Sequence, residues 1–149
     1  MSYTIETCSI EEILADVALL EDNWTDVAKN KELMVLSPDR EKYLMLEANN
    51  QLICIAAKID GVLVGYSVNI LQYHLHYSNL FYCNNDVIYL HSNLRDNPLG
   101  LRLIKRTEQL AKERGAKLML WHAKENTALD KLLRRMNCKV QDIIHSKEL

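Results

Sequence analysis

Glycine, proline and long apolar runs are all scarce in this sequence. Only 4 glycines and 2 prolines occur among 149 residues, a composition that argues against a disordered or loop-rich chain. No apolar run approaches the roughly 18 residues that a membrane-spanning helix requires. The amino-terminal segment also lacks the basic and then apolar pattern of a secretory signal. We therefore expect a cytoplasmic protein that does not enter a membrane.

Cysteines are few, and their spacing matches no known metal or disulfide pattern. The 4 cysteines are scattered and form no C-x-x-C pair. This spacing favours reduced thiols over a disulfide framework or a zinc site. His74 and His76 share one side of an expected strand, but two histidines without a third ligand are thin evidence for a metal. We expect no metal site.

An excess of positive charge is also missing. The 18 Lys and Arg residues are balanced by 20 Asp and Glu residues, which gives a net charge of −2. Proteins that bind nucleic acids generally are strongly basic, so we do not expect a nucleic-acid partner. Positive charge is nevertheless concentrated in the second half of the chain, at Lys105, Arg106, Lys112, Arg114, Lys131, Arg134, Arg135 and Lys139.

The hydrophobic periodicity predicts ten elements in the order β-α-α-β-β-β-α-β-α-β. A capping box at Ser9 and Glu12 opens the first helix, Ser37-Pro38 opens the second, and Asp60-Gly61 predicts a hairpin. Strands are expected at 3–8, 52–59, 62–71, 81–90, 116–123 and 138–149, and helices at 10–24, 38–48, 99–114 and 126–136. We predict an α/β fold in a single domain, 1–149, with a mixed, mostly antiparallel central sheet and helices on both faces.

The stretch from Tyr89 to Ile104 carries the clearest functional signal. It joins the end of an expected strand to an expected helix through a polar loop that contains Arg95, Asn97, Pro98 and Gly100. A loop that turns directly into a helix leaves several main-chain N–H groups unpaired, and the helix dipole adds partial positive charge there. Such a place suits a phosphate, and we predict that it holds the pyrophosphate of a coenzyme.

On these residues the chain resembles the GNAT superfamily of acyl-CoA-dependent N-acetyltransferases, particularly its small phage and bacterial members. The coenzyme loop of that family reads R/Q-x-x-G-x-G/A between a strand and a helix. Here Arg95 and Gly100 match its first and last positions, and Pro98 replaces the middle glycine. The family's later helix opens with Asn and closes with Gly-Phe; here Asn126 opens it and Asn137-Cys138 stands at its end.

The resemblance implies that acetyl-CoA is the co-substrate and that an unidentified amine, on a small molecule or a protein, attacks its thioester directly. Pantetheine would pair with the main chain of Ile88, Tyr89 and Leu90, and an N–H near Leu90 would polarise the carbonyl. The expected contacts to the rest of the coenzyme are Arg95, Asp96, Asn97, Pro98, Leu99, Gly100, Leu101, Arg102 and Asn126. Ordinary alternatives stay open, because Arg95 and Arg102 could be solvated surface charges and Asn126 could be only a helix cap.

Three side chains are candidates for the chemistry itself. Asp86 lies where the resemblance places a general base for the amine, although Asn84-Asn85-Asp86 could be only a polar bulge. Tyr89 could line the acceptor pocket or act as an acid, or simply pack. His91 could bind substrate or coenzyme, or cap the loop.

Two departures from the family pattern favour an alternative function. Pro98 has no N–H to offer a phosphate. The position from which a tyrosine often protonates the leaving thiolate is Leu133 here. The alternative is a GNAT-fold protein that binds a protein or nucleic acid without catalysis. The resemblance also leaves a homodimer open.

Overall fold

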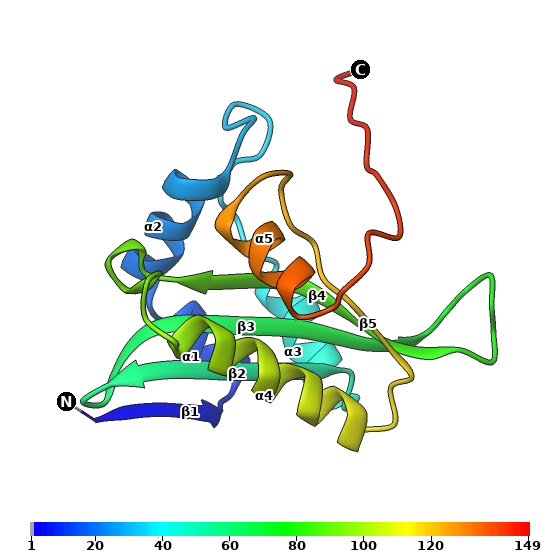
Figure 1. Cartoon of the computed structure of the whole chain (residues 1–149), viewed down its shortest axis with the longest axis horizontal. Helices are drawn as coiled ribbons and strands as arrows, with labels where there is room; N and C mark the ends of the chain where they lie inside the picture. Colours follow the sequence, from blue (N-terminus) through cyan, green and yellow to red (C-terminus); the bar gives the residue numbers. More distant parts are fainter. Residues whose placement is uncertain (1) are drawn as a thin grey trace.

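A five-stranded sheet with the spatial order β1-β2-β3-β4-β5 forms the centre of the computed structural model, which describes residues 2–149 (Figure 1). Its strands are β1 (Tyr3–Thr7), β2 (Leu52–Ile59), β3 (Val62–Tyr73), β4 (Phe81–Leu90) and β5 (Leu118–Leu120). The helices are α1 (Ile10–Leu14), α2 (Val17–Val27), α3 (Arg40–Ala48), α4 (Leu99–Glu113) and α5 (Ala128–Arg135), with a 3-10 turn η1 (Ser92–Leu94) before α4. The predicted α/β class and mostly antiparallel sheet are confirmed.

The sheet is antiparallel except at one edge. Strands β1 to β4 pair antiparallel, whereas β4 and β5 pair parallel across the α4 crossover. The predicted hairpin is present, with Asp60 at φ 49° and Gly61 at φ 81°. Both angles lie in the left-handed region that Asp and Gly tolerate, so the local sequence accounts for the turn.

Helices cover both faces of the sheet, and each face has its own core. Under α1 and α2, buried Ile10, Ile13 and Leu19 pack with Tyr66 and Val68 of β3. Under α4, a second cluster contains Ile53, Ile55, Leu71, Cys83, Leu103 and Ala111. We call these the α1–α3 face and the α4 face. No helix within residues 2–149 is long and apolar enough to cross a membrane.

Strand β4 contains a β-bulge at its polar interruption. Val68 pairs with Val87 and Asn69 pairs with Asn85, so Asp86 is the extra residue on β4. A bulge leaves one residue out of the ladder and re-aims its side chain. The structure therefore presents Asp86 as an exposed side chain in the middle of an otherwise half-buried strand.

Several predicted boundaries are wrong. The expected final strand, 138–149, does not form, and Val140, Ile143 and Ile144 are exposed there. These apolar residues do not alternate strictly, so they offer no continuous face to bury, and β5 pairs only with β4.

Some predicted helix starts are also wrong. In each case a polar side chain further along the chain is the residue that caps the helix. Asp16 accepts from Leu19 N at 3.1 Å and divides the expected first helix into α1 and α2. Asp39, rather than Ser37-Pro38, caps α3. Thr127, rather than Asn126, caps α5, because Asn126 has φ 63° and lies outside the helix.

Candidate active site

Strands β4 and β5 separate at a fork. Their pairing ends at Asn84 and Leu120, while β4 continues to Leu90 beside β3. Within the described chain, residues 85–90 therefore have no strand partner on the side away from β3. Main-chain N–H and C=O groups on such an edge are available to an extended ligand.

Asp86 lies just beyond the fork and is held by Tyr43 of α3. The Tyr43 hydroxyl donates a hydrogen bond to Asp86 Oδ2. Burial, and then this bond and the charge of Asp86, hold the pKa of Tyr43 well above its ordinary value. Tyr43 therefore remains a donor throughout the physiological range and orients a carboxylate that is open to solvent.

A second polar pair marks the fork itself. His122, two residues after β5, places Nε2 2.7 Å from Asn84 Oδ1. Cys83 packs into the core of the α4 face, so the adjacent Asn84 points to the opposite face. That is also the face on which Asp86 meets Tyr43, and the two polar pairs therefore share the α1–α3 face of the sheet.

Tyr89 and His91, the other two candidates for chemistry, are engaged with α2 and η1. The Tyr89 hydroxyl donates to Asp26 Oδ2 at 3.1 Å, and its ring packs 6.2 Å from the ring of Tyr66. His91 Nδ1 accepts from Asn93 N at 3.3 Å and so caps η1. These contacts supply packing and capping roles, and a catalytic role for either residue stays a prediction.

The loop before α4 is braced by its own side chains. Asn97 Oδ1 accepts from Leu99 N at 3.0 Å, and the N–H groups of Leu94 and Asn97 donate within the loop. The N–H groups of Leu94, Asn97 and Leu99 are therefore already used within the loop. Those of Gly100 and Leu101 lie in the first turn of α4, where helical N–H groups lack partners within the helix.

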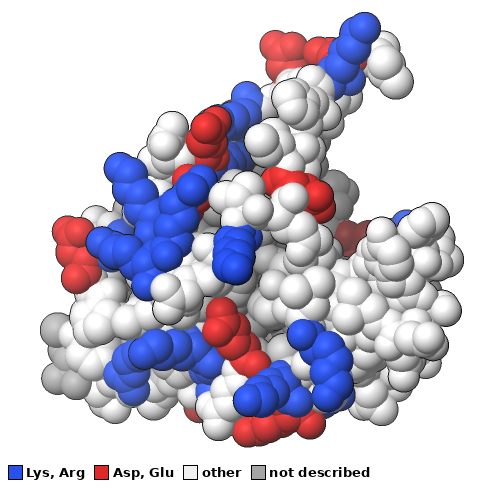
Figure 2. Space-filling view, turned by 45° about the vertical axis from the view of Figure 1, so that its right-hand side comes forward, with Lys and Arg blue, Asp and Glu red and all other residues white. Residues whose placement is uncertain are grey.

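The side chain of Arg95 contacts α2 and Tyr89 instead of the expected phosphate site. Its guanidinium donates to Asp26 Oδ2 at 2.7 Å and lies 5.6 Å from the centre of the Tyr89 ring. It fastens the loop to α2, and Arg102 in the first turn of α4 is also exposed. Figure 2 shows Lys and Arg side chains in separate clusters with Asp and Glu between them, rather than one continuous basic surface.

The packing around Gly100 does not explain why this position is a glycine. A Cβ added at Gly100 would meet only Leu90 Cδ2 at 3.6 Å, an ordinary contact. The fold therefore tolerates alanine at this position. A ligand that approached the main chain closely would require glycine there. No group of three potential metal ligands lies together in residues 2–149.

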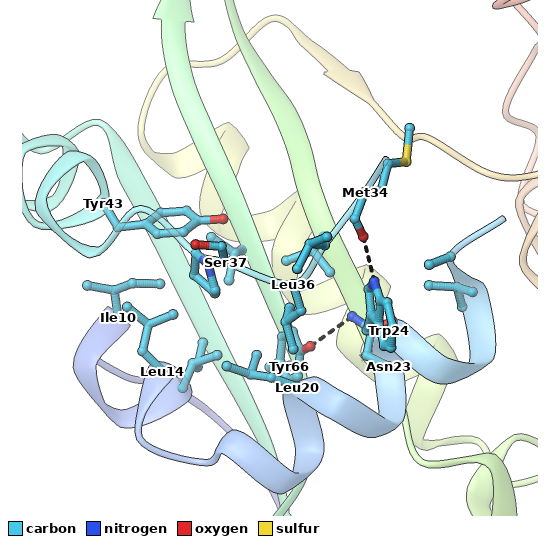
Figure 3. Close-up of a pocket in the computed structure, with 17 residues that line it drawn as sticks. Ile10, Leu14, Leu20, Asn23, Trp24, Met34, Leu36, Ser37, Tyr43 and Tyr66 are labelled. Atoms are coloured by element: carbon cyan, nitrogen blue, oxygen red, sulfur yellow. Dashed lines mark hydrogen bonds between the residues drawn. The ribbon is translucent and has the colours of Figure 1, made fainter. Parts of the chain in front are cut away.

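A pocket lies beside the Tyr43–Asp86 pair on the α1–α3 face (Figure 3). Its cavity volume is about 310 Å³. The walls come from α1, α2, the segment 28–38, α3 and strands β3 and β4. The sequence carries no local signal for the Tyr43–Asp86 contact, the His122–Asn84 contact or this pocket, because each depends on segments that are far apart in the chain.

Comparison with known families identifies the chain. The model of the acetyltransferase (GNAT) family matches residues 17–137. The chain therefore belongs to the GNAT acetyltransferase family, and the sequence-based assignment is confirmed. Comparison with curated protein sequences gives no match.

Solved structures share the fold over the whole chain. An aminoglycoside acetyltransferase from an uncultured soil metagenomic sample has a TM-score of 0.75 at 16% identity, and the match covers 100% of this chain and 99% of that chain. A ribosomal-protein-alanine N-acetyltransferase from Brucella melitensis biovar Abortus 2308 has a TM-score of 0.74 at 17% identity, covering 100% and 98%. Glucosamine-6-phosphate N-acetyltransferase from Arabidopsis thaliana has a TM-score of 0.75 at 10% identity, covering 99% of each chain. At these identities the similarity establishes the fold and not the acceptor.

Proposed function

We propose that the protein is an acetyl-CoA-dependent N-acetyltransferase with its reaction centre at the β4–β5 fork. The observation that carries the proposal is the placement of Asp86. The bulge presents its carboxylate just beyond the last β4–β5 pair, Tyr43 orients it, and an uncharged pocket adjoins it. Family membership supports this class of reaction, and the fork is the site that we propose for it.

Acetyl-CoA would bring a thioester, whose carbonyl carbon accepts the amine. The main chain of Ile88, Tyr89 and Leu90 would hold pantetheine along the unpaired edge of β4. The amides of Gly100 and Leu101, with Arg102, would hold phosphate. Asp96, Asn97, Pro98, Leu99 and Asn126 complete the proposed contacts.

Asp86 would act as the general base. An aliphatic amine is an ammonium ion at neutral pH, and its nitrogen has no free electron pair until a base takes a proton. The new bond joins nitrogen to the carbonyl carbon while the carbon–sulfur bond breaks. Of the two protons that the ammonium gives up, one passes through Asp86 to solvent and one ends on the sulfur of the coenzyme.

The proton for sulfur needs a different donor from the usual tyrosine. Leu133 occupies that position, is 6% exposed and has no proton to give. The imidazole of His122 lies at the fork, and Asn84 Oδ1 orients its Nε2. We assign the proton donor to His122. His122→Gln should lower turnover more than Asn84→Ala, since Asn84 only positions the ring. Unchanged turnover in His122→Gln would overturn this role.

The experiment that tests the function measures coenzyme binding and turnover separately. Isothermal titration should show binding of acetyl-CoA and CoA at micromolar concentrations, and thioester consumption should depend on an added amine. Absence of CoA binding at high micromolar concentration would overturn the proposal. Binding without turnover across a broad amine panel would favour the alternative, a GNAT-fold binding protein, which the buried Leu133 also favours.

Two loop variants form a matched pair for the coenzyme site. Gly100→Ala should fold normally, because its Cβ meets only an ordinary contact, and should weaken CoA binding by about tenfold or more. Pro98→Gly should leave CoA binding unchanged or slightly tighter, because Pro98 donates nothing to a phosphate. The opposite ranking would show that the loop needs the fixed φ of Pro98 rather than space at Gly100.

A further inference from the structure

The pocket beside Asp86 contains a buried polar atom without a partner. Asn23 of α2 is 8% exposed, and its Nδ2 donates to the Tyr66 hydroxyl at 2.8 Å (Figure 3). Asn23 Oδ1 is fully buried and makes no hydrogen bond, and no other buried side-chain nitrogen or oxygen in residues 2–149 is left so. An unsatisfied buried acceptor destabilises a fold, so its presence requires a reason.

The same pocket is lined without any charged side chain. None of the residues that line it is Asp, Glu, Lys, Arg or His. Apart from Asn23, the polar side chains in the wall are those of Trp24, Ser37, Tyr43 and Tyr66. Trp24 Nε1 donates to Met34 O at 2.7 Å and so holds the segment 28–38 against α2. The wall is therefore apolar and braced, as in sites for small organic molecules.

The polar atoms lie at two sides of this apolar space. Tyr43, which is bonded to Asp86, lies on one side of the pocket in Figure 3, and Asn23 lies on the other beside Trp24. A ligand whose nitrogen reached Asp86 would therefore place its far end near Asn23. The volume of about 310 Å³ lies at the small end of the range for ligand sites.

We propose that the acceptor is a primary amine on a single apolar body, of about the size of one aromatic ring, with a hydrogen-bond donor at its far end. Asn23 Oδ1 accepts from that donor and determines specificity. This proposal rests on the proposed function, because it takes Asp86 as the group that receives the amine. The donor completes the hydrogen bonding of Asn23, and the ring replaces water against Leu20, Trp24 and Leu36.

The same features exclude multiply charged acceptors. A second ammonium group is strongly disfavoured in an uncharged pocket unless a carboxylate pairs with it, and the pocket lining offers none. Aminoglycosides and polyamines are therefore poor acceptors for this chain, whatever its similarity in fold to aminoglycoside acetyltransferases.

Three amines of similar shape test the proposal. Tyramine carries a hydroxyl donor opposite its amine, phenethylamine carries none, and 4-methoxyphenethylamine carries only an acceptor. Wild-type protein should acetylate tyramine with a kcat/KM about tenfold above that of phenethylamine, because the buried acceptor is left unpaired by the latter. Equal rates for these two amines would overturn the proposal. A preference for the methoxy compound would do so as well, since it would mean that the free group is the amide nitrogen.

Two variants separate the acceptor atom from the surrounding packing. Asn23→Leu keeps a side chain of similar size and should remove the preference for tyramine. Tyr66→Phe removes the partner of Asn23 Nδ2 but leaves Oδ1, and should retain the preference. Loss of the preference in Tyr66→Phe but not in Asn23→Leu would overturn the assignment.

A binding measurement keeps this test independent of turnover. Trp24 lines the pocket, and Trp121 is the other tryptophan in the chain. In Trp121→Phe protein, tyramine should change the fluorescence of Trp24 at lower concentration than phenethylamine, and Asn23→Leu should abolish this difference. A protein that binds tyramine selectively but not CoA would refute the proposed function and retain the pocket assignment. A protein that binds CoA and shows no amine selectivity would refute the pocket assignment and retain the proposed function.

Discussion

The two faces of the sheet bury similar polar side chains but treat them differently. On the α4 face, Asn69 Nδ2 donates to Ile53 O at 3.1 Å and to Ser67 Oγ at 2.8 Å. Asn85 Nδ2 donates to Asn69 Oδ1 at 2.8 Å, and Thr107 Oγ1 lies 3.1 Å from Ser67 Oγ. This network, formed by Ser67, Asn69, Asn85 and Thr107, is buried and satisfied within the protein.

The α1–α3 face leaves its polar groups open. Asn23 Oδ1 has no partner, Asp86 is exposed, and Asn23 and Tyr43, the partner of Asp86, both line one cavity. A satisfied network stabilises and fixes a fold, whereas an unsatisfied group beside a cavity costs stability until a ligand pairs with it. The difference agrees with our proposal that the α1–α3 face receives the substrate, while the α4 face maintains the structure. The following substitutions test this division.

The largest expected effect is on turnover, in Asp86→Asn. Asparagine keeps the shape and can still accept from Tyr43, but it cannot take a proton from an ammonium ion. The value of kcat should fall by about a hundredfold or more, while CoA affinity and the free energy of unfolding stay nearly unchanged. Steady-state kinetics beside calorimetry and urea unfolding check this result. A comparable loss of stability would mean that Asp86 is a structural group.

The reverse pattern is expected for Asn69→Leu on the α4 face. This change removes the hydrogen bonds that Asn69 makes with Ile53 O, Ser67 and Asn85 in the core, and should reduce the free energy of unfolding by about 3 kcal/mol. Thr107→Val removes one hydroxyl from the same network and should cost about 1 kcal/mol. Urea unfolding measures both. If the two variants were as stable as wild type, the network would not be what maintains this face.

In alkaline solution the two faces should lose stability in the same way, because a buried thiol lies under each. Burial raises the pKa of Cys83, under α4, from about 9 to about 12, and that of Cys54, on the α1–α3 face, further still. Above pH 9 the unfolded thiol ionises while the folded one keeps its proton, so stability present below pH 9 is lost as the pH rises toward 12. Each thiol should add about 1.4 kcal/mol per pH unit to this loss.

Cys83→Ala and Cys54→Ala are the matched variants for the alkaline prediction. Each should reduce the dependence of unfolding free energy on pH between 9 and 12, measured by urea unfolding at several pH values. An unchanged slope in Cys54→Ala alone would show that water reaches the thiol on the α1–α3 face, and that the cavity extends into the core.

The smallest expected effect is the stability change in Asn23→Leu. Leucine removes the unsatisfied Oδ1, which should raise the stability, and the hydrogen bond to Tyr66, which should lower it. The two effects therefore oppose each other. The free energy of unfolding should change by less than about 1 kcal/mol, well below the loss in Asn69→Leu. A loss as large as in Asn69→Leu would contradict the division between the two faces.

Much of the fold could be predicted because its signals are local. The hairpin at Asp60-Gly61, the helix start near Leu99 and the stop at Gly115, with φ 96°, each depend on residues a few positions apart. The polar interruption Asn84-Asn85-Asp86 also marked the bulge. The strand expected at 138–149 failed because a strand needs a neighbour and a face to cover, and local composition carries neither.

The amino-acid sequence by itself determined most of the element types, much of their order, the family and the loop before α4, because periodicity and turn chemistry operate over short distances. Only the tertiary structure decided which side chains share a site. Tyr43 reaches Asp86 and Asn23 reaches Tyr66 across 43 positions each, and Arg95 reaches Asp26 across 69. These contacts depend on how helices pack on the sheet, and the buried Asn23 Oδ1 becomes an unpaired acceptor only after that packing has excluded water.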